Sequence, residues 1–335
     1  MTVRVGIIGV GNMGADHART FVAHVPGASL AAVYDADSKR AAAVAEETGA
    51  ASVAASPEAL ISDAKIDAVL IASPDQTHGA LTLACIAARK PVLCEKPLAP
   101  TPKECLEVLA AETKAGRRLV QTGYMRRYDP AYVDMKARWK SGVLGKPLMF
   151  HCMHRNVSAP DWFTSNMAIA NSAVHEFDIA RWMLDSELIS AHVFQPEAVT
   201  TGLIVKPLFL VLHSASGQLV NVEIFNNATY GYDVRGELVC EKGTVSLRSP
   251  VTSETSVALG QSVAYPEDWR PRFADAYRLQ NQAWVKAIQK GAATIEGASA
   301  WDGYAAGAVA EAGLASLAEG RTVAITLAEK PALYR

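Results

Sequence analysis

The sequence predicts an α/β protein of two domains: a doubly wound parallel sheet in the N-terminal part, then an α+β domain on a mainly antiparallel sheet. Three observations support this prediction. The chain has 335 residues, which is long for a single hydrophobic core. Short apolar runs alternate with helical patterns up to about residue 123, and strand-like runs follow one another after it. We therefore expect domains at 1–123 and 124–335.

The first part of the chain alternates between strand and helix. The run VRVGIIGV (3–10) is apolar and β-branched, and the helical pattern after its glycines carries His17, Phe21 and Val22. Further strands are expected at 29–35, 66–74 and 118–124, and the run 91–97 is expected to be a strand followed by a loop. Further helices are expected at 38–49, 56–63, 78–90 and 101–116. This rhythm is typical of a parallel sheet with helices on both faces.

The second part has a different pattern. Helices are expected at 130–141, 165–184, about 274–290 and 300–319. Strand-like runs occupy 188–196, 208–227 and 234–247, and the last two contain the turn signals SASGQ and EKG. Two strands joined by a short glycine turn predict a hairpin, so this sheet is expected to be mainly antiparallel.

Composition argues against several classes of protein. The formal charge is −2 and no lysine- or arginine-rich run occurs, so we expect neither a nucleic-acid partner nor an anionic membrane. Lys206 and Pro207 interrupt the longest apolar stretch, and the N-terminus leads directly into a strand, without a leader pattern. The cysteines are odd in number and form no CxxC pair, which predicts reduced thiols and a cytoplasmic location; they are Cys85, Cys94, Cys105, Cys152 and Cys240.

A glycine-rich turn between the first strand and helix predicts a dinucleotide site. Gly9 allows a tight turn, Gly11 lets the backbone approach a pyrophosphate, and Gly14 lets the helix pack closely. Asp35 ends the second strand, where a carboxylate accepts hydrogen bonds from a ribose. Its charge would repel a 2′-phosphate, which favours NAD, although Lys39 and Arg40 keep NADP as an alternative.

The stretch SNMAIANSAVHEFDIARWML (165–184) places Asn171, His175 and Asp178 four and three residues apart. On one continuous helix these side chains share a face. His175 is then either a general base with an orienting partner or an ordinary packed histidine. Asn171 has a simpler reading as a helix N-cap, and Asp178 has one as an ion-pair partner of Arg181.

Three motifs together carry a family resemblance: GVGNMG (9–14), SPDQTH (73–78) and CEKPL (94–98). With these motifs the chain resembles the Gfo/Idh/MocA family of oxidoreductases, whose EKP signature matches residues 95–97. Later segments, including VHEFD and YGYD, are most similar to the myo-inositol 2-dehydrogenase branch. The resemblance implies a Rossmann domain and an open-faced C-terminal sheet that builds a homotetramer or homodimer. It also implies hydride transfer from a ring carbinol to a nicotinamide.

The resemblance also implies roles for individual residues. It makes His175 the acid/base, places Lys96 beside the reacting hydroxyl, and assigns the supporting aspartate to the position of Asn171. Cofactor contacts would come from Gly9, Gly11, Asn12, Met13, Gly14, Asp35, Ser73, His78, Glu95 and Lys96. Substrate contacts would come from Met125, Arg126, His154, Asn156, Ser172, His175, Asp178 and Tyr232.

Asn171 departs from the family pattern. An asparagine can hydrogen-bond an imidazole, but it supplies no negative charge for an imidazolium and can select the wrong tautomer. In serine-protease triads the analogous change lowers the rate about 10⁴-fold. Whether this asparagine is a natural retuning or an engineered change stays open from the sequence.

Three functions are compatible with these residues. The first is NAD-dependent oxidation of a cyclic polyol, with inositol as the leading substrate. The second is oxidation of an aldose or another pyranose by the same groups, because both rings carry equatorial hydroxyls. The third is a catalytically weak NAD-binding sugar sensor, for which Asn171 is the only direct support. No metal site is expected, since His151 and His154 would face opposite sides of a strand.

Overall fold

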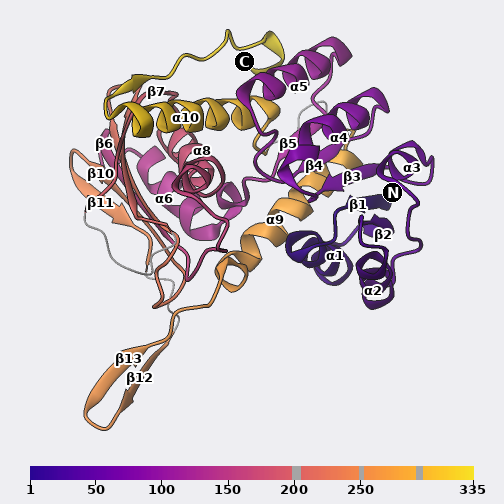
Figure 1. The fold of residues 1–335 in the computed structure, drawn as a ribbon, viewed down its shortest axis with the longest axis horizontal. Helices are drawn as coiled ribbons and strands as arrows, with labels where there is room; N and C mark the ends of the chain where they lie inside the picture. The colour runs from indigo at the N-terminus through magenta and orange to yellow at the C-terminus, as the bar shows by residue number, and fades with distance from the viewer. Residues whose placement is uncertain (198–204, 249–252, 292–296) are drawn as a thin grey trace. The chain divides into compact units, whose positions relative to one another are not determined.

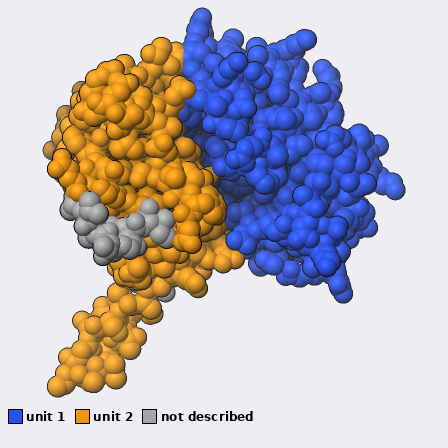
Figure 2. Space-filling model, viewed as in Figure 1, with its two compact units in different colours: residues 1–125, 276–307, 328–335 blue, residues 126–275, 308–327 orange. Residues whose placement is uncertain are grey.

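The computed structural model describes residues 1–197, 205–248, 253–291 and 297–335. The chain forms two compact units, coloured separately in Figure 2. The first comprises 1–125, 276–307 and 328–335, and the second comprises 126–275 and 308–327. These units differ from the contiguous ranges expected from the sequence, because residues of the C-terminal part pack with the first unit.

Within its described residues the first unit contains a five-stranded parallel sheet in the order β2-β1-β3-β4-β5 (Figure 1). The strands are β1 (Val3–Ile8), β2 (Ala28–Tyr34), β3 (Ala68–Ile71), β4 (Val92–Cys94) and β5 (Val120–Thr122). Each lies within a run expected to be a strand, apart from one residue at the start of β2. The order places β1 in the interior of the sheet with β2 and β3 on either side. The predicted doubly wound sheet is confirmed.

Helices connect these strands, and several begin at a side-chain cap. They are α1 (Asn12–His24), α2 (Ser38–Thr48), α3 (Pro57–Ser62), α4 (Asp75–Ala87) and α5 (Pro102–Ala115). The Asp37 carboxylate accepts hydrogen bonds from the first amides of α2, and Thr101 and Glu104 form a capping box at α5. Gly116 ends α5 in the left-handed conformation that glycine adopts most easily.

The core of the first unit joins segments that are far apart in the sequence. Val3, Val5 and Phe21 are buried in one hydrophobic cluster with Trp284 and Val285. The last two belong to α9 (Trp269–Gln289), which departs from helical geometry at Phe273 and then continues into the first unit. Burial of side chains of this size stabilises by roughly 1.5–3 kcal/mol each. The first unit is therefore complete only with this part of α9.

The second unit carries, among its described residues, a seven-stranded sheet in the order β11-β10-β6-β9-β8-β7-β14. The strands are β6 (Pro147–Arg155), β7 (Leu188–Phe194), β8 (Leu208–Ser214), β9 (Leu219–Phe225), β10 (Asp233–Cys240), β11 (Gly243–Ser246) and β14 (Val323–Ala324). Only the β6–β9 pair is parallel among these pairings, so the mainly antiparallel sheet is confirmed. The turns at SASGQ and EKG join β8 to β9 and β10 to β11, as predicted.

The expected helix at 165–184 is interrupted, which corrects the sequence prediction. The structure has a short turn of α7 (Ser165–Met167), a π-helical turn (Ala168–Ser172) and then α8 (Val174–Leu184). In the π-helical turn the Ala173 amide donates to the Ala168 carbonyl at 2.9 Å, five residues back. Asn171 therefore lies in a wider turn than a continuous α-helix would provide. It is also not the N-cap of α8, because that position is Ala173.

The remaining elements are helical apart from one hairpin. Short 3₁₀ turns occur at Met125–Tyr128 and Ala332–Tyr334, and the longer helices are α6 (Pro130–Lys140) and α10 (Ala300–Glu319). The hairpin of β12 (Glu254–Val257) and β13 (Gly260–Val263) extends away from the seven-stranded sheet, and all of its residues are exposed (Figure 1). No helix in the described part of the chain has the length and apolarity needed to span a membrane.

Candidate active site

The glycine turn after β1 is sterically closed to larger residues. Gly9 has φ of +85°, and a Cβ there would lie 2.4 Å from the Ser73 backbone nitrogen. A Cβ on Gly14 would lie 1.8 Å from the Gly9 carbonyl oxygen, so α1 packs directly on the turn. By contrast, a Cβ on Gly11 would meet nothing within 4 Å. Asn12 and Met13 form the first turn of α1, just after this open position.

Asp35 is held at the end of β2 by backbone amides. Its Oδ2 accepts from the Val10 amide at 2.8 Å, and its Oδ1 accepts from the Asp37 amide at 2.9 Å. The Arg40 guanidinium lies 3.2 Å from Asp35 Oδ1 and 3.7 Å from Asp37 Oδ2. A cavity of about 480 Å³ adjoins this carboxylate, and its lining includes Gly9, Gly11, Asp35, Arg40, Ser73 and Thr77.

His78 ties the loop after β3 to the EKP segment. Its Nδ1 lies 2.6 Å from the Pro97 carbonyl oxygen, and its Nε2 lies 2.8 Å from the Ser73 carbonyl oxygen. Carbonyl oxygens only accept hydrogen bonds, so both ring nitrogens donate and the imidazole carries a positive charge. Burial opposes this charge, but the Cys94 sulfur and the Pro97 carbonyl raise the pKa of His78 to about 10.

Glu95 is oriented by a buried histidine. The Nδ1 of His17 accepts from the Asn281 side-chain amide at 3.0 Å, so its Nε2 carries the proton and donates to Glu95 Oε1 at 2.9 Å. The other Glu95 oxygen accepts from the Lys96 amide at 3.3 Å. Lys96 itself is half-buried and follows β4, as predicted. From the sequence, His17 and Asn281 are placed only in expected helices, and neither is assigned a role in the site.

In the second unit, five of the predicted substrate residues lie in or beside one buried polar cluster: Arg126, His154, Asn156, His175 and Tyr232. Glu176 in α8 forms an ion pair with Arg126 and accepts from His154 Nδ1 at 3.0 Å. Arg126 Nη2 lies 3.4 Å from the same His154 nitrogen, and Asn156 Nδ2 lies 3.4 Å from His154 Nε2. Burial alone would raise the pKa of Glu176, but Arg126 and His154 hold it below its usual range.

Aromatic rings extend this cluster. The ring centroids of His154 and His175 are 6.5 Å apart, and Tyr232 meets His154 edge-on at 5.9 Å. Burial raises the pKa of the Tyr232 phenol, so the hydroxyl stays protonated at neutral pH. Phe273 lies under the Arg126 guanidinium, with its ring centroid at 5.3 Å. His175 therefore lies beside His154, whose ring also contacts Tyr232.

Asp178 has a different arrangement from the other predicted contacts. Its two carboxylate oxygens accept from Arg127 Nε at 2.9 Å and from Arg127 Nη2 at 2.5 Å. Arg181, the ion-pair partner considered from the sequence, lies 3.9 Å from it. Both Asp178 oxygens thus contact an arginine from the 3₁₀ turn that begins at Met125.

The remaining predicted residues are Ser172, Asn171 and Met125. The Ser172 hydroxyl accepts from the Asn226 side chain at 3.1 Å, and Asn171, its neighbour in the π-helical turn, is half-buried. Met125 is buried and is the last residue of the first segment of the first unit. Sequence reasoning missed Glu176, His17 and Asn226, which contact predicted residues. For Glu176 the one signal is its burial among the apolar residues of α8, which indicates that its carboxylate has polar partners inside the unit.

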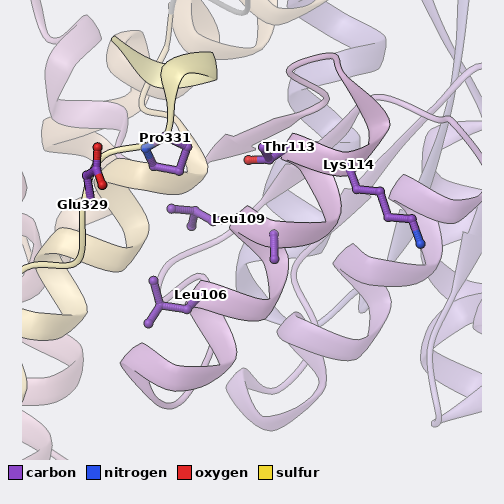
Figure 3. Close-up of a pocket in the computed structure, with 7 residues that line it drawn as sticks. Leu106, Leu109, Thr113, Lys114, Glu329 and Pro331 are labelled. Carbon is purple, nitrogen blue, oxygen red and sulfur yellow. The ribbon is translucent and has the colours of Figure 1, made fainter.

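A metal site and a second cavity are the two other candidates in the described residues. No group of three or more His, Cys, Asp and Glu side chains is placed to hold a metal ion in the described part of the chain. A second cavity of about 480 Å³ lies between α5 and the C-terminal segment (Figure 3). Leu106, Leu109 and Pro331 make it mainly apolar, the Lys114 side chain extends away from it, and none of the predicted site residues line it.

Two family models match the chain. The model of an oxidoreductase family with an NAD-binding Rossmann fold matches residues 3–124, and the GFO/IDH/MocA C-terminal domain matches residues 132–246. The first match lies in the first unit and the second match lies in the second unit.

Relatives that match over their full length are inositol dehydrogenases. Inositol 2-dehydrogenase 1 of Saccharopolyspora erythraea is 53% identical over 337 residues, covering 100% of this chain and 99% of the relative. An inositol 2-dehydrogenase of Acidothermus cellulolyticus is 42% identical over 338 residues, covering 100% and 98%. The crystal structure of myo-inositol dehydrogenase from Lactobacillus casei with NAD(H) and myo-inositol matches with a TM-score of 0.95 at 30% identity, over 100% of both chains.

Proposed function

The chain belongs to the Gfo/Idh/MocA family of NAD-binding oxidoreductases, and we propose that it oxidises a ring hydroxyl of a cyclic polyol to a ketone, with inositol as the substrate. The observation that carries this proposal is the likeness, over the whole chain, to a structure solved with NAD(H) and myo-inositol. The buried cluster of Arg126, His154 and Tyr232 supports it, because a polyol needs several fixed polar partners.

The first unit fits an NAD cofactor. The open position at Gly11 leaves room for a pyrophosphate at the start of α1, whose amides favour an anion. The Asp35 carboxylate, already oriented by two amides, is suited to accept from ribose hydroxyls. We assign the further contacts to Asn12, Met13, Ser73, His78 and Glu95. NAD, when bound, supplies the acceptor of the hydride that leaves the carbinol carbon.

Proton transfer falls to the chain's own residues. We assign His175 the role of the base that takes the hydroxyl proton, because an imidazole titrates near neutral pH. We assign Lys96 the stabilisation of the developing alkoxide by its ammonium group. Both roles follow the family resemblance. Asn171 takes the place of the supporting aspartate, so the imidazolium lacks that negative charge and the rate is expected to be attenuated.

Recognition of the ring hydroxyls is assigned to the remaining predicted residues. Arg126 and the Asn156 amide are donors, and His154 Nε2 is an acceptor. The Tyr232 hydroxyl can donate or accept, as can Ser172. Asp178 and Met125 are the other two residues that we assign to contact with the substrate. For Asp178 a substrate hydroxyl would share the carboxylate with Arg127.

The quaternary structure and location are also proposals. Exposed apolar residues on the sheet of the second unit, including Phe194, Phe209 and Ile189, support a homotetramer or homodimer through that sheet. The five cysteines are buried, and all are free thiols. Reduced thiols support a cytoplasmic location.

The test is NADH formation from NAD with myo-inositol, scyllo-inositol, D-glucose, L-glucose and D-xylose, each over a range of concentrations. The proposal expects an inositol to give the highest kcat/KM. A higher value for a pyranose would replace it with the aldose or pyranose dehydrogenase. Tight NAD binding in calorimetry with no NADH from any polyol would instead favour the sugar sensor.

A further inference from the structure

Glu176 is the residue that joins the predicted substrate contacts, although neither the motif pattern nor the family resemblance assigned it a role. We propose that Glu176 is a positioning residue that fixes the Arg126 guanidinium and one tautomer of His154, so that His154 Nε2 faces the substrate as an acceptor. This inference deepens the proposed function and rests on it for the identity of the substrate.

The contacts of Glu176 divide between its two oxygens. Oε1 pairs with Arg126 Nη1, and Oε2 accepts from His154 Nδ1 at 3.0 Å. The side chains of Glu176 and Arg126 are each 1% exposed, and that of His154 is 6% exposed. At this burial water competes little for the hydrogen bonds of Glu176, so Arg126 and His154 are both held in one geometry.

The carboxylate selects the tautomer of His154. An ionised carboxylate only accepts hydrogen bonds, so the nitrogen that faces it must carry the proton. Arg126 Nη2 also lies near this nitrogen, at 3.4 Å, but a guanidinium only donates and cannot be its acceptor. Nε2 is therefore left as the acceptor, and the Asn156 amide lies 3.4 Å from it. A substrate hydroxyl can donate to the same nitrogen.

Glu176 also provides the counter-charge for Arg126. The guanidinium is buried against the Phe273 ring, and a buried charge without a partner is strongly destabilising. Hydrophobic residues of similar volume often stabilise a protein as well as a buried ion pair does. Stability alone therefore gives no reason for a charged pair here, whereas fixed orientation of Arg126 and His154 does.

The first test uses the unmodified protein. Nitrogen-15 NMR of labelled histidines at pH 8, without substrate, reports which ring nitrogen carries hydrogen, and the His154 signals are assigned by their loss in His154→Gln. The expected result is a protonated Nδ1 and an unprotonated Nε2. A protonated Nε2 with a bare Nδ1 would overturn the proposal, whatever the substrate turns out to be.

The second test separates positioning from stability. Glu176→Gln keeps the shape but removes the charge, and we expect KM for the polyol to rise about 10-fold or more. KM for NAD should stay within about twofold, since the predicted cofactor residues lie in the first unit. Glu176→Asp keeps the charge and should restore part of the loss and the His154 tautomer.

A matched control is Glu223→Gln, which breaks a half-buried carboxylate–arginine pair with Arg155 on the same sheet. Its polyol KM should equal that of the unmodified protein. If Glu176→Gln lowers thermal stability but leaves the polyol KM unchanged, Glu176 is only structural and the proposal is wrong. If Glu176→Gln does not fold, the histidine spectrum and Glu176→Asp still decide. If the unmodified protein oxidises no polyol, the proposed function fails, while the tautomer result still tests Glu176.

Discussion

The Arg40 guanidinium lies 3.2 Å from Oδ1 of Asp35. The carboxylate that favours NAD is therefore ion-paired with the guanidinium that could bind the 2′-phosphate of NADP. We therefore expect Asp35→Ser to lower kcat/KM with NAD about 10-fold or more and to raise kcat/KM with NADP by a similar factor. The reason is twofold: the ribose loses its acceptor, and Arg40 becomes available. Steady-state kinetics with both cofactors measure the ratio.

The control for this cofactor prediction is the double variant Asp35→Ser with Arg40→Ala. It should lose the gain with NADP, since the remaining phosphate partner is then Lys39. An unchanged NAD-to-NADP ratio in Asp35→Ser would show that Asp35 does not set the preference.

Asn171→Asp should increase the rate of polyol oxidation. A carboxylate at this position can stabilise the imidazolium of His175, and we expect kcat to rise about 10- to 100-fold. The measurement is NADH formation by both proteins on the same polyol panel, with Asn171→Ala as the control that only removes the amide. If the aspartate variant is no faster than the original protein, the asparagine has no catalytic cost here and our account of it is wrong.

The charge on His78 predicts a pH-dependent stability. Because the pKa in the folded protein, about 10, lies above the unfolded value of 6.5, the stabilisation is complete below pH 6.5. It is lost as the pH rises through 10, and amounts to at most roughly 3–5 kcal/mol. Urea unfolding at pH 7 and pH 9.5 should show a fall in the free energy of unfolding that His78→Asn lacks.

The exposed His24 provides the matched control for His78, and His24→Asn should keep the full pH dependence. Other groups titrate in this range, so the comparison is between variants and not between pH values alone. An equal fall in the original protein and in His78→Asn would mean that His78 is neutral in the folded state.

Within the first unit, the buried Glu112 carboxylate binds the C-terminal segment through Tyr334. Glu112 accepts from the Leu119 and Val120 amides and from the Tyr334 hydroxyl. Tyr334→Phe leaves one carboxylate oxygen without its donor, and we expect a loss of about 1–3 kcal/mol in the free energy of unfolding. The half-buried Tyr265 serves as control, since Tyr265→Phe should cost less than about 0.5 kcal/mol. Equal effects of the two variants would contradict the role of the Glu112 contact.

Local patterns predicted most of the fold and fewer of the site contacts. Alternating apolar runs predicted β1 to β5, because parallel strands are buried on both faces and stay apolar. They did not predict β6, since His151, His154 and Arg155 dilute its apolar pattern although it pairs with both β9 and β10. The π-helical turn was missed as well, because one residue more per turn leaves no signal in composition.

The missed site residues have a common cause. Glu176, His17 and Asn226 act through other residues, and each partner is more than 20 positions away in the chain, as for His17 and Glu95. Motifs record spacing along the chain and not such long-range pairs. A resemblance transfers only the positions that its pattern includes. Burial of a charged side chain, which only a structure reveals, was needed to find Glu176.

The arrangement of Trp284 and Val285 in the core with Val3 and Val5 has a consequence for recombination of such enzymes. A gene segment encoding residues 1–125 does not carry a whole folding unit, because residues 276–307 and 328–335 belong to it as well. Exchange of cofactor preference by grafting this N-terminal cassette from a relative would pair foreign strands with the host's α9. Successful chimaeras will be those that exchange the cassette and its C-terminal complement together.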